Sequence, residues 1–276
     1  EDIPGVGKTT LARALARISG LNYNRIQLTP DVTASDITGY NIYNRKNEEF
    51  EFKKGVVMCN ILLADEINRA SPKTQSSLLE AMSESRVTVD GTNFELPQPF
   101  MVIATQNPLG YVGTYPLPEA QLDRFSIKFS LGYPAPEKEI EIAMGKSHDK
   151  TLKNIKAIAD EESIRALQCK TENITCDKAI YEYIVNLVSI TRKTKYFSLG
   201  ASPRASISLA RLAKAFALIS GRDYVLPSDI SFLFESALSH RVILSQEARA
   251  AGVSASDILL KAKETINPPY FSKSGK

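Results

Sequence analysis

A glycine-rich loop followed by lysine and threonine stands at the start of the chain. Gly5, Gly7, Lys8 and Thr9 match the second half of the phosphate-binding pattern GxxxxGK[ST]. In that pattern the glycines let backbone N–H groups close around phosphates, the lysine reaches the β and γ phosphates, and the threonine hydroxyl holds Mg²⁺. The alternative is a glycine-rich turn before an ordinary helix. The residues that we assign to nucleotide binding are Pro4, Gly5, Val6, Gly7, Lys8, Thr9 and Thr10.

Asp2 occupies the place of the first glycine in this pattern. Aspartate tolerates a left-handed backbone better than most residues, so we expect the turn to persist. Its carboxylate next to a polyphosphate would oppose nucleotide binding. The chain begins at Glu1 inside this loop, with no buried strand before it. We therefore expect it to be a piece of a longer protein whose first core strand is missing.

Two carboxylates, Asp65 and Glu66, follow an apolar run at 61–64 that reads as a strand. Ligands bind at the carboxyl ends of the strands in an α/β sheet. Asp65 can hold Mg²⁺ through water, while Glu66 can orient and polarise an attacking water. A strand that ends in a solvated acidic turn is the alternative, and the upstream loop makes it less favoured because ATP hydrolysis needs both parts. The acidic pair favours an ATPase over a GTPase.

Three polar residues further along the chain can act on the same phosphates. Asn107 follows an apolar strand pattern at 100–105, although an asparagine before proline is also a plain turn signal. Arg124 can neutralise phosphate charge as an arginine finger does, although an isolated Asp-Arg pair is more often a surface salt bridge. Arg204 follows Ser202 and Pro203, a helix start. A cation in that first turn opposes the helix dipole, so a bound phosphate or a nearby carboxylate should stabilise it.

Taken together, these segments resemble the MoxR family of AAA+ ATPases. A phosphate loop alone is generic, whereas the ordered series of matching strings is specific and runs through most of the chain. The strings are 29–31 (TPD), 35–39 (SDITG), 64–70 (ADEINRA), 73–75 (KTQ), 87–91 (VTVDG), 104–108 (ATQNP), 113–125 (GTYPLPEAQLDRF) and 202–205 (SPRA).

The resemblance implies a role for each candidate residue. Lys8 and Thr9 would belong to Walker A, with Thr9 and Asp65 at the metal. Glu66 would be the catalytic residue of Walker B, Asn107 sensor 1, Arg124 the finger that reaches a neighbour's ATP, and Arg204 sensor 2. The cofactors implied are ATP and Mg²⁺.

The elements that must position these residues follow from the apolar pattern. We expect residues 1–132 to form an α/β AAA+ core, a parallel sheet whose first strand is truncated, and 133–276 to form an all-α lid. The break at 132–136 (GYPAP) reads as the linker. Ile180, Ile184, Leu187 and Val188 share one face of a lid helix, and residues 230–238 supply another. We predict strands at 21–28, 56–64, 100–105 and 125–130, and helices at 8–20, 72–84 and 119–123.

Two hairpins interrupt the predicted core. In the first, apolar residues at 41–43 and 50–52 flank a polar run. In the second, Asp90 and Gly91 stand between two alternating segments, which is a strong signal for a two-residue turn. By resemblance, these are the helix-2 insert and the pre-sensor-1 hairpin, which would face a ring pore or a partner. Two decorative edge hairpins are the alternative.

Composition excludes several classes of protein. Lys and Arg number 34 and Asp and Glu 31, and this near balance does not predict a nucleic-acid-binding surface. The longest apolar run, at 56–64, is too short to span a membrane and is broken by Asn60. Three scattered cysteines predict neither a disulfide framework nor a zinc site, and they fit a reducing cytosol.

The residues and the resemblance together predict an ATPase that converts ATP and water to ADP and phosphate. The resemblance implies a homo-oligomer, a hexameric ring, that acts as a chaperone-like factor for the assembly or metal loading of a client protein. It also implies a partner with a von Willebrand factor A domain. Two alternatives remain: a nucleotide-binding scaffold with little turnover, and a related motor such as a magnesium chelatase-type subunit or a helicase.

Overall fold

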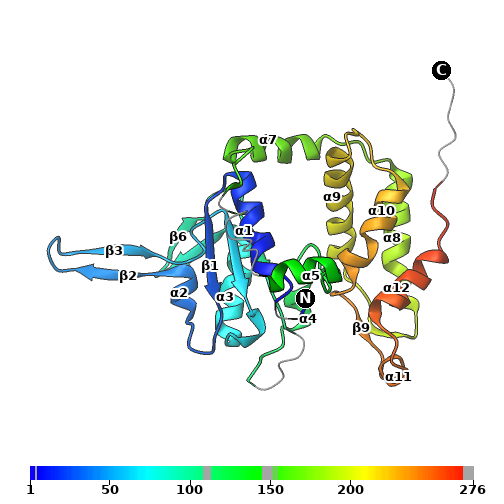
Figure 1. Cartoon of the computed structure of the whole chain (residues 1–276), viewed down its shortest axis with the longest axis horizontal. Coiled ribbons are helices and arrows are strands. Elements are labelled where there is room, and N and C mark those ends of the chain that lie inside the picture. The colour runs from blue at the N-terminus through cyan, green and yellow to red at the C-terminus, as the bar shows by residue number, and fades with distance from the viewer. Residues whose placement is uncertain (4, 108–112, 145–151, 153, 270–276) are drawn as a thin grey trace. The chain divides into compact units, whose positions relative to one another are not determined.

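The computed structural model describes residues 1–3, 5–107, 113–144, 152 and 154–269. The chain forms two compact units (Figure 1). The core unit comprises residues 1–117 and 130–165, and the helical unit comprises residues 118–129 and 166–276. The sequence predicts a single change at residue 132. In the structure the chain instead crosses into the helical unit early, at 118–129, and returns to the core unit before leaving it again.

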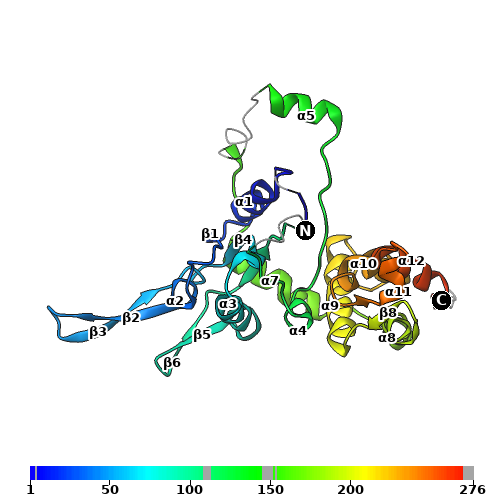
Figure 2. The ribbon, with the colours of Figure 1, turned by 90° about the horizontal axis from the view of Figure 1, so that it is seen from below.

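A three-stranded parallel sheet forms the centre of the core unit. Its order is β1 (Tyr23–Gln27), β4 (Ile61–Asp65) and β7 (Met101–Ala104). The central strand β4 is buried at every position, as its unbroken apolar sequence requires in a parallel sheet. Figure 2 shows α1 (Lys8–Ser19) and α3 (Pro72–Glu84) on opposite sides of β4. All three strands therefore deliver the residues after them to one edge of the sheet.

The helices of the core unit begin where local signals place them. Gly7 caps α1, and the Ser71 side chain accepts a hydrogen bond from the Thr74 N–H at the start of α3. In α1, Ala12 and Ala16 are buried, while Leu11 and Leu15 are 48% and 42% exposed. The small residues of α1 thus face the sheet, and its leucines face away from it. The same unit also contains α2 (Ala34–Thr38), the 3-10 helix η1 (Ile67–Arg69) and α5 (Pro136–Ala143).

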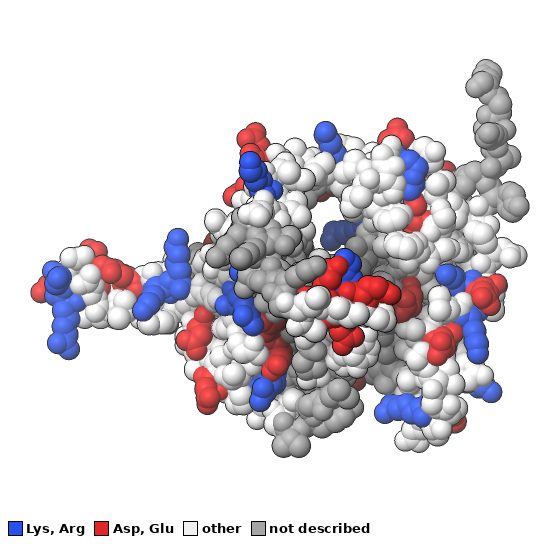
Figure 3. All heavy atoms as spheres, in the orientation of Figure 1, with Lys and Arg blue, Asp and Glu red and all other residues white. Residues whose placement is uncertain are grey.

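Both predicted hairpins are present. The first pairs β2 (Gly39–Asn44) with β3 (Glu49–Lys54), and the second pairs β5 (Arg86–Val89) with β6 (Thr92–Glu95). Asp90 and Gly91 have φ values of 48° and 79°, as a two-residue hairpin turn of this kind requires. On the face seen in Figure 3, the β2–β3 hairpin carries side chains of both charges.

Two strand predictions need correction. The run 56–64 forms a strand only from Ile61, because Asn60 ends a turn with its side chain bonded to Asn22 N and Pro99 O. The segment 125–130 forms no strand. Its Phe125 carbonyl accepts hydrogen bonds from His240 and Arg241, and its Lys128 N–H donates to the Ser236 carbonyl. Hydrogen bonds to other residues of the helical unit therefore occupy backbone groups of this segment that would otherwise pair with a neighbouring strand.

The helical unit packs around two faces that the sequence predicts. Ile180, Ile184 and Leu187 of α8 (Lys178–Lys193) and Ile230 and Phe234 of α10 (Pro227–Leu238) are each at most 1% exposed. A short ladder of β8 (Phe197–Leu199) and β9 (Ile243–Leu244) adds to the predicted helices. None of the helices described is long and apolar enough to cross a membrane. The remaining helices are α4 (Glu119–Leu122), α7 (Glu161–Glu172), α8 (Lys178–Lys193), α9 (Pro203–Ile219), α10 (Pro227–Leu238), α11 (Gln246–Ala250) and α12 (Ala255–Glu264).

Candidate nucleotide site

The phosphate-binding loop leads directly into α1. Gly5 and Gly7 have φ values of 89° and 95°, in the region that favours glycine. Gly7 makes no side-chain capping bond, so the first N–H groups of α1 are available to an anion from outside the helix. The assignment of Pro4 to nucleotide binding concerns a residue outside those described.

The Lys8 ammonium lies over the start of its own loop. Its Nζ donates hydrogen bonds to the carbonyl oxygens of Asp2, at 2.5 Å, and Ile3, at 3.1 Å. Both acceptors are neutral. Phosphate oxygens would be stronger, charge-assisted acceptors, so these two contacts suit a side chain that changes partners when a nucleotide binds.

The Asp2 carboxylate is engaged by backbone N–H groups. Its Oδ2 accepts hydrogen bonds from Leu131 N, at 2.6 Å, and Gly132 N, at 3.0 Å, and its Oδ1 accepts one from Ile3 N. Burial acts to raise the pKa of Asp2, but these hydrogen bonds outweigh it and lower the pKa below the usual 3.8. Asp2 is not among the described non-glycine residues with positive φ, so the expected left-handed conformation does not occur. Its charge is held by residues 131–132.

Asp65, at the end of β4, lies beside Thr9. The Thr9 hydroxyl donates to Asp65 Oδ2 at 3.5 Å, so the two predicted metal-site residues meet. Arg25 Nε pairs with the same oxygen at 2.7 Å, and the Thr105 hydroxyl donates to Oδ1 at 3.2 Å. Oxygen ligands of this kind, one hydroxyl and one carboxylate, fit Mg²⁺.

Glu66 follows in a strained backbone conformation. Its φ and ψ are 56° and 53°, in the left-handed region that a residue with a Cβ rarely adopts. Two bonds hold it there: Glu66 N donates to Thr105 Oγ1 at 2.9 Å, and Ile67 N donates to Thr105 O at 3.0 Å. The side chain pairs with Arg69 at 3.0 Å. Such strain costs about 1–3 kcal/mol and concentrates at functional sites.

Sequence reasoning missed Arg25 and Thr105. Arg25 lies on β1 and Thr105 directly follows β7, the two strands next to β4, and both reach the Asp65 carboxylate. A charged residue in the middle of the predicted strand 21–28 was the available signal for Arg25. No signal pointed to Thr105, because its contact depends on the register between β4 and β7.

Asn107 is brought to the same edge of the sheet. The Asn68 side chain donates to the Asn107 carbonyl at 3.5 Å, and Asp2 N donates to the neighbouring Gln106 carbonyl at 3.3 Å. The residue is half-buried. The segment after β7 therefore lies between the phosphate loop and the segment after Asp65.

Arg124 and Arg204 belong to the helical unit, whereas Lys8 and Asp65 belong to the core unit. Both arginines are exposed. Ser202 is the N-cap of α9, and its hydroxyl accepts from Arg204 N and donates to Asp123 Oδ2 at 2.8 Å. The structure thus brings the segments that carry the two arginines together, within one unit.

His240 gives this region a pH dependence that can be measured. Burial lowers the pKa of His240 to about 4, aided by the charges of Arg241 and Lys128 and opposed by the Phe125 carbonyl and Asp123. The imidazole is therefore neutral in the fold, with Nε2–H donating to Phe125 O at 2.9 Å.

We expect the helical unit to lose stability as the pH falls below 6.5. An unfolded histidine takes up a proton near that pH, whereas folded His240 does not do so until about 4. The loss at pH 5 amounts to about 2 kcal/mol. Urea unfolding at pH 7.5 and pH 5, beside His240→Gln, checks this. An equal pH dependence in the variant, which cannot titrate at this position, would contradict it.

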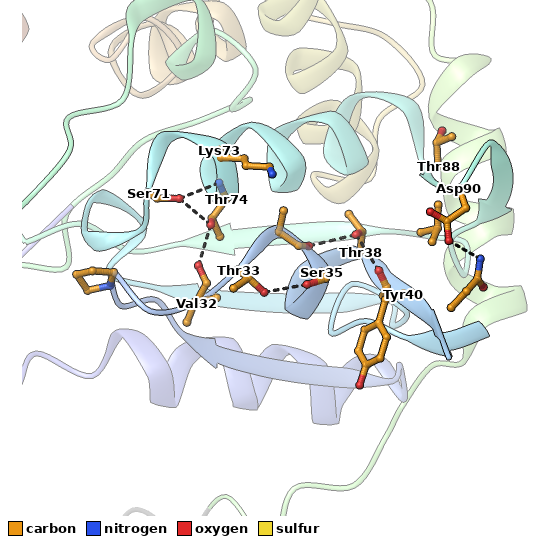
Figure 4. A pocket seen from close by; sticks show the side chains of 15 residues that line it. Val32, Thr33, Ser35, Thr38, Tyr40, Ser71, Lys73, Thr74, Thr88 and Asp90 are labelled. Atoms are coloured by element: carbon orange, nitrogen blue, oxygen red, sulfur yellow. Dashed lines mark hydrogen bonds between the residues drawn. The ribbon is translucent and has the colours of Figure 1, made fainter. Parts of the chain in front are cut away.

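A surface pocket of about 660 Å³ lies away from these residues, between α2, the start of α3 and the two hairpins (Figure 4). Much of its polar lining is already paired. Thr74 Oγ1 donates to the Val32 carbonyl at 2.8 Å, and the hydroxyls of Thr33 and Ser35 lie 2.9 Å apart. The loop before α1 and the end of β4 contribute no lining residue. The pocket is therefore separate from the residues predicted to bind the nucleotide.

Two protein families match the sequence in the order that the fold displays. Residues 1–127 match the ATPase family associated with various cellular activities (AAA), and residues 189–262 match the AAA lid domain. A crystal structure of a candidate ATPase from Cytophaga hutchinsonii superposes with a TM-score of 0.89 at 40% identity, covering 98% of this chain and 84% of that chain.

Relatives align over almost the whole sequence. YeaC of Bacillus subtilis (strain 168) is 48% identical over 269 residues, which cover 98% of this chain and 84% of that protein. Chaperone MoxR1 of Mycobacterium tuberculosis is 41% identical over 283 residues, which cover 99% of this chain and 74% of that protein. Because the chain matches the ATPase family and the lid domain, and because Chaperone MoxR1 aligns with it over almost its whole length, the chain belongs to the MoxR family of AAA+ ATPases.

Proposed function

We propose that this protein hydrolyses ATP to ADP and phosphate and uses the energy to remodel a partner protein. The observation that carries the proposal is the meeting of Thr9 and Asp65 at 3.5 Å, with the strained Glu66 next in sequence. A glycine-rich loop, a hydroxyl, a carboxylate and a second acid at one sheet edge are the parts that phosphoryl transfer to water needs.

Binding would fall to the loop before α1. Backbone N–H groups around Gly5, Gly7 and Thr10 would surround the phosphates, and Lys8 would exchange its two carbonyl acceptors for phosphate oxygens. Thr9 and Asp65 would hold Mg²⁺, with Arg25 giving up its share of the Asp65 carboxylate. The ion supplies neutralisation of the phosphate charge.

Turnover would depend on Glu66 and Asn107. Glu66 would orient the attacking water and draw off its proton, and Asn107 would hydrogen-bond the water or the terminal phosphate. The Glu66 carboxylate is paired with Arg69, 3.0 Å away, at the protein surface. Reorientation from Arg69 to the water is the step that a bound nucleotide would favour.

Arg124 would act on the ATP of a neighbouring subunit, and Arg204 would bind phosphate as sensor 2. A finger supplied by a neighbour requires an oligomer, and we propose a hexameric ring. The relative named Chaperone MoxR1 suggests a chaperone role. We extend that role here to the assembly or metal loading of a client in the cytoplasm, with a von Willebrand factor A domain protein as partner.

The hairpins would transmit motion to that partner as one piece. Phe52 of β3 stacks on Phe94 of β6, with centroids 3.8 Å apart and planes 11° apart. At the turn of the second hairpin, the Asn41 side chain donates to Asp90 at 2.8 Å (Figure 4). Two contacts of different kinds thus tie the β2–β3 hairpin to the β5–β6 hairpin.

Removing the ring stack should uncouple the hairpins. We expect a double-mutant cycle of Phe52→Ala and Phe94→Ala to give an interaction energy of about 1 kcal/mol, since stacked aromatic pairs contribute 0.5–1.5 kcal/mol. Amide exchange in 39–54 should rise in Phe94→Ala. Phe50→Ala, at a ring 72% exposed that contacts only its own hairpin partner Tyr43 among the described rings, is the control. Additive single effects would count against the coupling.

The test of the function is ATP hydrolysis by the full-length protein over a range of protein concentrations. Specific activity that rises with concentration is expected, because a site completed by a neighbour is inactive in the monomer. Tight ATP binding without turnover at any concentration would support the scaffold alternative. Asp2→Gly would then show whether the aspartate in the loop limits turnover.

A further inference from the structure

The residues on either side of the proposed finger, Arg124, are anchored by a buried cation. Arg241 is 7% exposed. Its Nη2 donates to the Phe125 carbonyl at 2.6 Å, and its Nε lies 3.4 Å from Asp123 Oδ1. The neighbouring His240 donates to the same Phe125 carbonyl at 2.9 Å. The residues on both sides of Arg124 are thereby fixed to the turn after α10.

Burying a guanidinium costs several kcal/mol unless partners compensate for it. Burial lowers the pKa of Arg241, the Asp123 charge raises it, and the Arg204 charge lowers it. Among the described residues, neither Nη1 nor Nε has a hydrogen-bond acceptor, so Asp123 acts on Arg241 through its charge. The Asp123 carboxylate and the Phe125 carbonyl are therefore the groups that compensate the charge of Arg241. The attachment of the segment around Arg124 and the burial of Arg241 consequently depend on each other.

Asp123 joins this anchor to the helix that carries Arg204. One carboxylate oxygen faces Arg241, and the other accepts from the Ser202 hydroxyl at 2.8 Å. A second attachment lies further on, where Ser208 of α9 donates to the Ser126 carbonyl at 3.4 Å. The segment is thus held from both ends against the helical unit.

We propose that Arg241 is a positioning residue that holds Arg124, through Asp123 and the Phe125 carbonyl, where it can reach the ATP of a neighbouring subunit. The inference rests on the proposed function. Arg241 itself touches no nucleotide in this scheme. Its loss should leave the phosphate loop and Glu66 of its own subunit intact and disable only the finger that this subunit offers.

Mixing variant subunits separates a defect in the subunit's own ATP site from a defect in the finger that it offers to its neighbour. Arg241→Met alone and Glu66→Gln alone are each expected to lose most turnover. In mixed rings, an Arg241→Met subunit keeps a complete site of its own and receives an intact finger from a Glu66→Gln neighbour. At equal amounts and random mixing, about a quarter of wild-type activity should return, because half the sites are competent and half of those have a competent neighbour.

Two matched mixtures make the outcome decisive. Arg124→Ala with Glu66→Gln should recover in the same way, while Lys8→Ala with Glu66→Gln should stay inactive because both defects lie in the subunit's own site. ATP binding by Arg241→Met should match wild type. If circular dichroism shows that this variant does not fold, Arg241→Lys replaces it. A lysine keeps the positive charge but lacks the planar guanidinium that contacts Asp123 and Phe125 together.

Three results would overturn the inference. The first is wild-type ATP turnover in the folded Arg241 variant. The second is that its mixture with Glu66→Gln recovers no turnover while the Arg124→Ala mixture does. The third is that neither mixture recovers turnover. Inactive wild-type protein would overturn the proposed function instead. Recovery of both mixtures with unchanged ATP binding supports the inference, because a defect confined to packing would not be corrected by a neighbour with an inactive site.

Discussion

Glu66→Gln is expected to abolish ATP turnover while ATP still binds. The amide has nearly the same shape as the carboxylate but cannot accept the proton of the attacking water. General base catalysis contributes about 10²–10⁴-fold, so the rate should fall at least about a hundredfold. Steady-state phosphate release and equilibrium ATP binding, measured on the same preparation, separate the two steps.

Geometry supports placing this effect on Glu66 and not on a neighbour. Its backbone is held in the left-handed region by Thr105, so its side chain leaves the sheet edge in a direction that an ordinary strand residue would not take. Glu84→Gln is a matched control, because Glu84 is a similarly charged acid paired with Arg86 at 2.8 Å on the surface. Turnover within a few-fold of wild type in Glu66→Gln would remove Glu66 from the proposed mechanism.

Phe234→Ala should produce the largest loss of stability in the helical unit. Phe234 is completely buried among the side chains of that unit's core. Truncating a buried phenylalanine removes its transfer free energy and leaves a cavity, which together cost about 3–5 kcal/mol. Urea unfolding monitored by helical circular dichroism measures the difference in unfolding free energy.

Phe232→Ala, on the same helix, supplies the comparison. Phe232 is 69% exposed and contacts Phe216 in a stack with centroids 5.0 Å apart. Its loss should cost no more than about 1.5 kcal/mol. Equal losses in the two variants would mean that α10 does not bury the face seen in the structure. Because Arg124 and Arg204 lie in this unit, Phe234→Ala should also impair turnover more than ATP binding.

Much of the fold could be predicted because its signals are local. Ser71 and Ser202 each precede a proline and cap a helix, Asp90 and Gly91 form a two-residue turn, and the apolar run before Asp65 becomes the central strand. In each case, neighbouring residues supply both the cause and the partner. The segment 125–130 shows the limit, since its apolar pattern suits a strand but its backbone groups bond to the helical unit.

The sequence by itself determined the phosphate loop, the acidic pair, the two hairpins and the apolar faces of the lid helices, since each depends on residues a few positions apart. Only the tertiary structure decided that Thr9 meets Asp65, that Arg25 and Thr105 share its carboxylate, and that Glu66 is strained. It also decided that Arg241 anchors the segment around Arg124. The hydrogen-bonded partners among these residues lie 39 to 116 positions apart in the chain, where no periodicity or spacing relates them and only strand register and helix packing bring them into contact.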